Sequence, residues 1–391
     1  MLRTAFLAGS LAASAHLVLS QSSFVPLAAK RFDDINALPY QVDTDNGERG
    51  RQYGYNQCNS TTEGQASNCQ TAIINSIDDF CLWGPPEYGE EVGNIEGEMV
   101  AWCTKEGHGT RIIPAGALTG VQFMRTPHYV QVVGFINQQQ INILPEDYGG
   151  EMDPHGADQR GNPLGGLIFS TAFAADGLTT TNGTTADGTA YQQVVQWHNF
   201  MGANQFCLKA CAPNWENGWA VCEHIFDRIG CNYNAPADYG SINGTFQSCD
   251  GEDQLPPGQY IGANGARSTY TQPPESLGVI TTIPYTAAIP ASSNCQTFES
   301  AALYTAGNSV SGAASSAAAS SSAASSSGAS SSGVSSGASS GASATSSTAT
   351  GTASNVAAAA STSAGGSSGA GKVVAGGVLG GVCALVAAFA L

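Results

Sequence analysis

Ten cysteines between Cys58 and Cys295 limit what this 391-residue chain can fold into more strictly than any other feature. An even number of cysteines in an exported chain indicates disulfide bonds. Four of them lie within residues 207–231, but their spacing lacks the paired C-x-x-C elements of common zinc sites. We therefore expect five disulfides and no metal, formed by Cys58, Cys69, Cys81, Cys103, Cys207, Cys211, Cys222, Cys231, Cys249 and Cys295.

The sequence favours some cysteine pairs without fixing all of them. Short loops and nesting favour two bonds within residues 207–231, whose partners stay open. The same argument favours three further pairs: Cys58 with Cys69, Cys81 with Cys103, and Cys249 with Cys295. Each bond would contribute about 2 to 4 kcal/mol to stability.

The N-terminal residues have the pattern of an export signal. Arg3 precedes an apolar run from Ala5 to Leu19, which predicts a signal peptide of residues 1–20 that is cut before Gln21. The dibasic pair Lys30-Arg31 would end a propeptide of residues 21–31, although such pairs also occur by chance.

The C-terminal residues indicate attachment to a cell surface. Residues 301–372 are mostly Ser, Ala, Gly and Thr, so we expect a disordered, O-glycosylated stalk. Residues 373–391 are apolar and no basic residue follows them, which favours a GPI-attachment signal over a retained membrane span. Ser363 is the predicted attachment residue, with Ser361 as the alternative. The expected location is the outer face of the plasma membrane, the cell wall, or both.

The charge balance excludes some partners. The chain has 13 basic and 30 acidic residues, a net charge of -17. An anionic surface argues against nucleic acid and against anionic membranes as partners.

Residues 32–300 read as a folded ectodomain made mainly of strands. Short, partly alternating apolar runs separated by polar turns occur throughout this region. We expect a mainly β, disulfide-stapled, sandwich-like domain. Its C-terminal part, with Pro273, Pro274, Pro284 and Pro290, should wrap the domain in extended form. The predicted strands are Gly120–Thr126, His128–Ile136, Ile141–Leu144, and the segments "EMVAWCT", "GGLIFSTAF" and "AYQQVVQWHNF".

One segment has helical periodicity. Apolar residues recur at steps of three and four from Trp219 to Ile229, and Gly230 follows as a stop signal. We therefore expect one short amphipathic helix there. His224 and Asp227 would be neighbours on its solvated face, as a catalytic pair or as ordinary surface residues.

Few residues suggest catalysis. The loop "DPHGAD" offers Asp153, His155 and Asp158 as ligands or as an acid/base pair, but a turn needs the same residue types. Glu96 and Glu98, two apart on one face of an expected strand, resemble the paired carboxylates of a glycosidase, although acidic surfaces produce such pairs freely. We expect no catalytic residue, metal or cofactor.

Three Asn-x-Ser/Thr sequences are expected to carry N-linked glycans because each lies in a polar, turn-like context of an exported chain. They begin at Asn59, Asn182 and Asn243.

Several long motifs resemble a known family. They are "DDFCLWGPP" (78–86), "DPHGAD" (153–158), "WHNFMGANQFCLKAC" (197–211), "CEHIFDRIGC" (222–231) and "TYTQPPESLG" (269–278). Together they resemble the macrophage-activating glycoproteins of basidiomycete fungi, which are secreted, Ser-rich, GPI-anchored surface proteins. This resemblance implies no catalytic residues. It implies recognition by host lectin receptors through glycans.

Two hypotheses follow for the function. The first is a non-catalytic glycoprotein of the cell wall or cell surface, carbohydrate-binding through its tryptophans or adhesive, with wall polysaccharide as partner. The second is a secreted carbohydrate-active enzyme that uses the Asp153 to Asp158 loop or a carboxylate pair.

Overall fold

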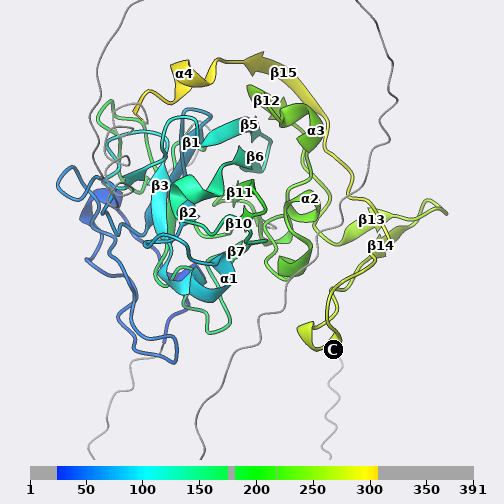
Figure 1. The fold of residues 1–391 in the computed structure, drawn as a ribbon, viewed down its shortest axis with the longest axis horizontal. Coiled ribbons are helices and arrows are strands. Elements are labelled where there is room, and N and C mark those ends of the chain that lie inside the picture. Colours follow the sequence, from blue (N-terminus) through cyan, green and yellow to red (C-terminus); the bar gives the residue numbers. More distant parts are fainter. Residues whose placement is uncertain (1–23, 175–180, 217, 307–391) are drawn as a thin grey trace, which may run out of the picture. The chain divides into compact units, whose positions relative to one another are not determined.

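The computed structural model describes residues 24–174, 181–216 and 218–306, and strands dominate this part of the chain (Figure 1). The prediction of a mainly β ectodomain is confirmed. The expected signal peptide, the GPI signal with Ser363, and nearly all of the stalk lie outside the described residues. No helix within the described ranges is long and apolar enough to cross a membrane.

One sheet has seven strands, in the order β15-β12-β5-β6-β11-β10-β7. β5 and β6 are the two strands that the sequence predicts around a short turn, and they pair antiparallel. β12 pairs parallel to β5, and the other neighbours are antiparallel. The strands are β5 (Leu118–Arg125), β6 (Tyr129–Ile136), β7 (Gly150–Met152), β10 (Trp197–Gly202), β11 (Gln205–Cys211), β12 (Phe246–Gly251) and β15 (Ser292–Thr297).

A second sheet has six strands, in the order β4-β3-β2-β1-β8-β9. The predicted strand at Ile141–Leu144 belongs to neither sheet. Its first residue ends a 3-10 helix, and Ile143 forms only an isolated bridge with Glu90. The strands are β1 (Thr71–Ser76), β2 (Asp79–Gly84), β3 (Val100–Cys103), β4 (Arg111–Ile112), β8 (Leu167–Ser170) and β9 (Gln192–Val194).

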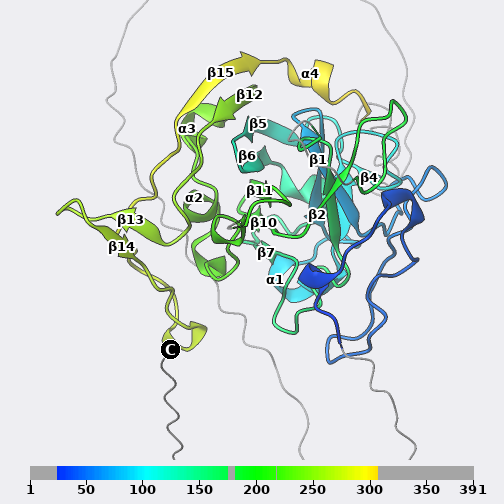
Figure 2. The same cartoon turned by 180° about the vertical axis from the view of Figure 1, so that it is seen from behind.

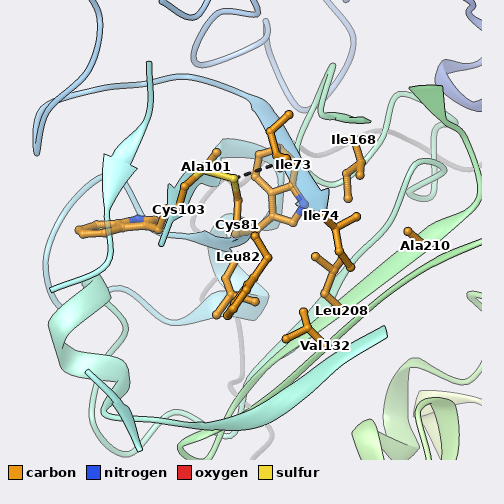
Figure 3. Close-up of a cluster of buried hydrophobic side chains, with 14 of the residues drawn as sticks. Ile73, Ile74, Cys81, Leu82, Ala101, Cys103, Val132, Ile168, Leu208 and Ala210 are labelled. Carbon is orange, nitrogen blue, oxygen red and sulfur yellow. Dashed lines mark hydrogen bonds between the residues drawn. A yellow bond between two sulfur atoms is a disulfide. The ribbon is translucent and has the colours of Figure 1, made fainter. Parts of the chain in front are cut away.

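The two sheets share one hydrophobic core (Figure 3). Ile74 of β1 and Leu82 of β2 lie on one side of it, and Val132 of β6 and Leu208 of β11 lie on the other. All four side chains are completely buried. Burial of a side chain of this size contributes about 1.5 to 3 kcal/mol, so this contact between the sheets contributes substantially to stability.

The outer face of the seven-stranded sheet is also covered, which explains why β6 and β11 are buried along nearly their whole length. Successive side chains of a strand point to opposite faces, so Leu208 enters the shared core while Cys207, Lys209 and Cys211 face outward. A segment of short helices and turns, residues 218–242, lies over this outer face. The disulfides Cys207–Cys231 and Cys211–Cys222 fasten it there.

The remaining disulfides join Cys58 to Cys69, Cys81 to Cys103 and Cys249 to Cys295. All ten of these cysteines are thus paired. The last three pairs are those that the sequence favours, whereas the two bonds within residues 207–231 have partners that the sequence left open. Cys81 and Cys103 lie directly opposite each other on β2 and β3.

The predicted amphipathic helix at Trp219–Ile229 is wrong. This stretch contains only two 3-10 turns, Gly218–Ala220 and Asp227–Ile229, with irregular backbone between them. The bond from Cys222 to Cys211 fixes the middle of the segment against β11, and two members of the apolar stripe, Trp219 and Ile225, are exposed. The segment is therefore held by its packing onto the sheet and not by the hydrogen bonds of a helix.

The helices are all short. None of those in the described ranges exceeds four residues. They are α1 (Val92–Ile95), α2 (Cys231–Asn234), α3 (Tyr239–Ile242), α4 (Ser300–Leu303), and the 3-10 helices η1 (Leu27–Ala29), η2 (Ile35–Ala37), η3 (Glu96–Glu98), η4 (Gln138–Ile141), η5 (Gly218–Ala220), η6 (Asp227–Ile229) and η7 (Glu275–Leu277).

Residues 254–291 form an arm that leaves the seven-stranded sheet after β12 and returns to it as β15 (Figures 1 and 2). Within the arm, β13 (Gln259–Ile261) and β14 (Arg267–Thr269) pair only with each other. The rest of it has turns, bends and irregular backbone apart from η7. The prediction that this segment wraps the domain is wrong for β13 and β14, which project from the body (Figures 1 and 2). The disulfide Cys249–Cys295 closes the arm at its base.

Residues 24–31 pack against the domain. Leu27 is 3% exposed, and its N–H donates to the carbonyl oxygen of Gln159 at 2.9 Å. The side chain of Gln193 donates to the carbonyl of Lys30 and accepts from the N–H of Phe32, so it holds the backbone on both sides of Arg31. The folded region therefore begins before the predicted boundary at residue 32.

Candidate functional site

The loop "DPHGAD" forms a tight turn next to β7. The Asp153 carboxylate accepts hydrogen bonds from the N–H groups of His155 (2.6 Å) and Gly156 (2.9 Å). Gly156 has a φ of 61°, a left-handed conformation that glycine adopts without strain. Asp158 forms an ion pair with Arg49 and accepts from the N–H of Arg160 at 3.1 Å. Both acids therefore have the turn-forming role that the sequence offered as one interpretation.

The third residue of that loop, His155, contacts a residue far away in sequence. Its ring stacks on His224, with 3.9 Å between centroids and 16° between planes, and its Nε2 lies 3.3 Å from Oε1 of Gln196. Burial lowers the pKa of His224, and His155 lowers it further, because two stacked imidazoles repel when both are charged. Asp227 does not pair with His224 and instead accepts a hydrogen bond from Gln272.

A carboxyl pair lies beside this turn, but it is not the pair expected. Glu96 and Glu98 belong to η3 and not to a strand, so they do not share a strand face, and Glu98 is exposed. Glu96 instead meets Glu151 of β7, whose backbone N–H donates to it at 3.2 Å. The prediction that Glu98 is the partner carboxylate of Glu96 in a glycosidase pair is therefore wrong.

Burial controls the protonation of both carboxyls. Burial, together with the smaller effect of the Asp153 charge, raises the pKa of Glu96 to about 8, even though the hydrogen bond from the N–H of Glu151 opposes the shift. Burial also raises the pKa of Glu151 well above its ordinary value. The side chain of Asn162 donates to Glu96 at 3.0 Å. Near neutral pH the folded protein therefore holds protons on these carboxyls, as a general acid must.

Sequence reasoning missed Glu151. Its strand has only three residues, too few to show a period, and nothing near it in sequence marks it as the partner of Glu96. It is 4% exposed, and one of its carboxyl oxygens has no hydrogen-bond partner. No group of three or more His, Cys, Asp or Glu among the described residues is arranged to hold a metal ion.

The tryptophans do not form the expected carbohydrate platform. Trp83, Trp102 and Trp197 are buried in the core, and Trp215 is half-buried against His128. Trp219 is exposed. The prediction of a carbohydrate-binding platform built from several tryptophans is therefore wrong for the described part of the chain.

Three tyrosines near one another in the chain or in space, here called the tyrosine ledge, are Tyr40 and Tyr53, which are exposed, and Tyr55, which is half-buried. Tyr53 and Tyr55 are two apart on an irregular segment, and Tyr40 stacks on Tyr55 with 5.5 Å between ring centroids. Tyr40 is 60% exposed and Tyr53 is 39% exposed. Hydroxyl-bearing rings that are open to water can stack on apolar faces while they keep their hydrogen bonds.

Two surface hollows also occur. The larger, the arm-root groove, has a volume of about 460 Å³ and is lined by Ile225 and Phe226 on one side and by Tyr270, Pro273 and Pro274 of the arm on the other. The smaller, about 380 Å³, is lined by polar residues such as Asn137 and Gln139 together with Ile136. The carboxyl pair Glu96 and Glu151 lines neither hollow.

The three glycosylation sequences have different settings. Asn59 and Asn243 are exposed. The side chain of Asn182 is half-buried and bonds to the backbone of Phe32 and Gln193. Attachment at Asn182 would therefore compete with contacts that hold the N-terminal segment.

Comparison with known proteins finds two fungal relatives. The chain is 45% identical over 236 residues to the appressorium protein ROW1 of Mycosarcoma maydis, a match that covers 59% of this chain and 52% of that protein. It is 38% identical over 252 residues to the appressorium protein ROW2 of the same fungus, covering 63% of this chain and 81% of that protein. The chain thus spans about half the length of ROW1. No protein-family model and no solved structure matches it.

Proposed function

Since this chain belongs to the family of the appressorium protein ROW2, we propose that it works at the outer surface of a fungal cell as a binding protein and not as an enzyme. The export signal, the Ser-rich stalk and the GPI signal that the sequence predicts support display at that surface. The resemblance to macrophage-activating glycoproteins gives the finer form of this proposal, in which host lectin receptors recognise its glycans.

The observation that carries the proposal is the tyrosine ledge. The rings of Tyr40 and Tyr53 are exposed on a disulfide-bonded domain, in which the bond from Cys58 to Cys69 closes the loop that follows Tyr55. Aromatic faces bind the apolar faces of sugar rings, and neutral sugars are not repelled by an anionic domain. We therefore assign neutral wall polysaccharide as the ligand and the ledge as its site.

Retention on insoluble wall glucan and on chitin tests this assignment. The double variant Tyr40→Ala/Tyr53→Ala should lose most retention, because it removes both exposed rings. Tyr148→Ala, which removes a comparably exposed tyrosine outside the ledge, is the matched control and should be retained like the wild type. Wild-type protein that stays unbound on both polymers would sink the assignment, and so would equal retention of the double variant.

A carbohydrate-active enzyme is the second candidate, and the raised pKa of Glu96 favours it. In that case Glu96 would donate a proton to a leaving group, and Glu151 would be its partner carboxyl. Against this, Glu151 is buried and neither described hollow is lined by the pair. Release of reducing ends from wall glucan by the wild type, abolished in Glu96→Gln, would establish the enzyme and reject the binding proposal.

A further inference from the structure

The arm carries most of the exposed large aliphatic side chains of the described residues. Ile261, Leu277, Val279 and Ile289 lie within it, and Leu277 is 73% exposed. Ile225, which is 57% exposed, lies at the arm-root groove. On the body, by contrast, the exposed large apolar side chains are mostly aromatic. Aliphatic exposure of this kind marks contacts with protein more than with sugar.

The charges on the arm differ from those on the rest of the chain. Residues 254–291 contain one basic residue, Arg267, and one acidic residue, Glu275, so the arm has no net charge. The whole chain has a net charge of -17. The acidic bodies of two copies therefore repel each other, whereas two arms, each without net charge, do not.

The arm also has both halves of a self-complementary contact. Its projecting side is Leu277, at the end of η7, and its receiving side is the arm-root groove, which has ample volume for a leucine side chain. Asp227, Arg228 and Glu275 also line the groove. The guanidinium of Arg228 donates to the carbonyl oxygens of Pro273 and Gly278 and so joins the two sides of the groove. In a two-fold pair, the projection of each copy enters the groove of the other.

The ribbon of β13 and β14 adds a second element to the same surface. The two strands pair only with each other, so their outer backbone edges are available to another strand. Ile261 stands on β13 and is 55% exposed.

We propose that the arm is a self-association surface, and that a second copy of this chain is its partner. The contact joins two acidic domains through arms that have no net charge, and it does not use the tyrosine ledge. Anchored copies would meet at a high effective concentration, which favours a contact of modest area.

Co-purification of two full-length chains that carry different tags, expressed together and extracted in detergent, tests the proposal. Wild-type chains should recover each other, and Leu277→Asp should lower recovery about tenfold or more, because it places a charge in an apolar contact. Ile261→Asp, at a separate exposed position, should act in the same direction. Tyr148→Asp is the control on the body and should leave recovery unchanged.

The salt dependence separates this contact from an ion-paired one. Raising the NaCl concentration from about 50 to about 300 mM should increase recovery, because salt screens the repulsion between the bodies and not the apolar contact. Recovery that falls with salt, wild-type chains that do not recover each other, or equal losses in Leu277→Asp and Tyr148→Asp would each overturn the proposal.

Discussion

The body and the arm are held together in different ways. In the body, two sheets bury completely apolar faces such as Ile74 against Leu208, and a further layer covers the outer face of β11. In the arm, two three-residue strands and an irregular segment rest on a small tyrosine cluster around Tyr285, and several large side chains stay exposed. The body is thus stabilised by packing, and the arm by its attachments. Changes in the two regions should have effects of different size and kind.

The largest effect is expected from a cavity in the shared core. Leu208→Ala removes a completely buried side chain between the two sheets and should lower the free energy of unfolding by about 2 to 5 kcal/mol. Leu277→Ala, a matched change at an exposed leucine of the arm, should alter it by less than about 0.5 kcal/mol. Urea denaturation followed by tryptophan fluorescence measures both. Equal losses would mean that the arm is part of the core.

The next largest effects are expected from removing disulfides, and these effects should differ between the body and the arm. Cys211→Ser/Cys222→Ser frees the layer over β11 and should lower the stability of the body by about 2 to 4 kcal/mol. Cys249→Ser/Cys295→Ser opens the base of the arm, so limited proteolysis should cut within residues 254–291 first. The melting temperature and mass spectrometry of the fragments report these two outcomes. If the protease cut the body of Cys249→Ser/Cys295→Ser as early as the arm, the two regions would not be stabilised in different ways.

The pH dependence of stability should come from the body. The folded state raises the pKa of Glu96 from 4.5 to about 8, so it holds a proton that the unfolded chain loses in this interval. The stabilising contribution is complete below about pH 4.5 and falls away as the pH rises towards 8. Glu96→Gln should flatten this decline and stabilise the protein at pH 8 by on the order of 2 kcal/mol.

Melting curves between pH 4.5 and 8 measure the effect of Glu96. The arm has one acid and one base, so its rate of proteolysis relative to the body serves as the internal control and should not follow the same profile. If the wild type became more stable as the pH rose, Glu96 would not be the dominant group.

The smallest effect is expected at the edge of the body. Because Gln193 holds the backbone on both sides of Arg31 and Leu27 is buried, the dibasic pair should escape cleavage in the folded protein. Lys30→Ala/Arg31→Ala should therefore leave the N-terminus of the secreted protein unchanged. Mass spectrometry of the N-terminal peptide tests this, and an N-terminus at Phe32 would show that the segment is removed.

The sequence predicted the body far better than the arm or the candidate site. Strands β5 and β6 were predictable because their apolar residues adjoin one another across a short turn. The Trp219–Ile229 helix failed because a period of three and four residues also arises where a chain packs irregularly under disulfide control. Glu96 was named without its partner Glu151, because they meet through packing of η3 on β7 over more than fifty residues of chain. Local periodicity contains no such information.

The end of the described chain determines how a mechanical pull would reach the domain. Tyr304 is buried, with its hydroxyl donating to the carbonyl oxygen of Ile77 and its ring against Phe80 and Phe246. Tension applied to an anchoring tail would act first on Tyr304 and the short α4, and then on Cys295. From there the disulfide passes the force directly to Cys249 in β12, within the seven-stranded sheet. The arm lies outside this path. In a tethered molecule under shear, the seven-stranded sheet therefore bears the tension and the arm does not.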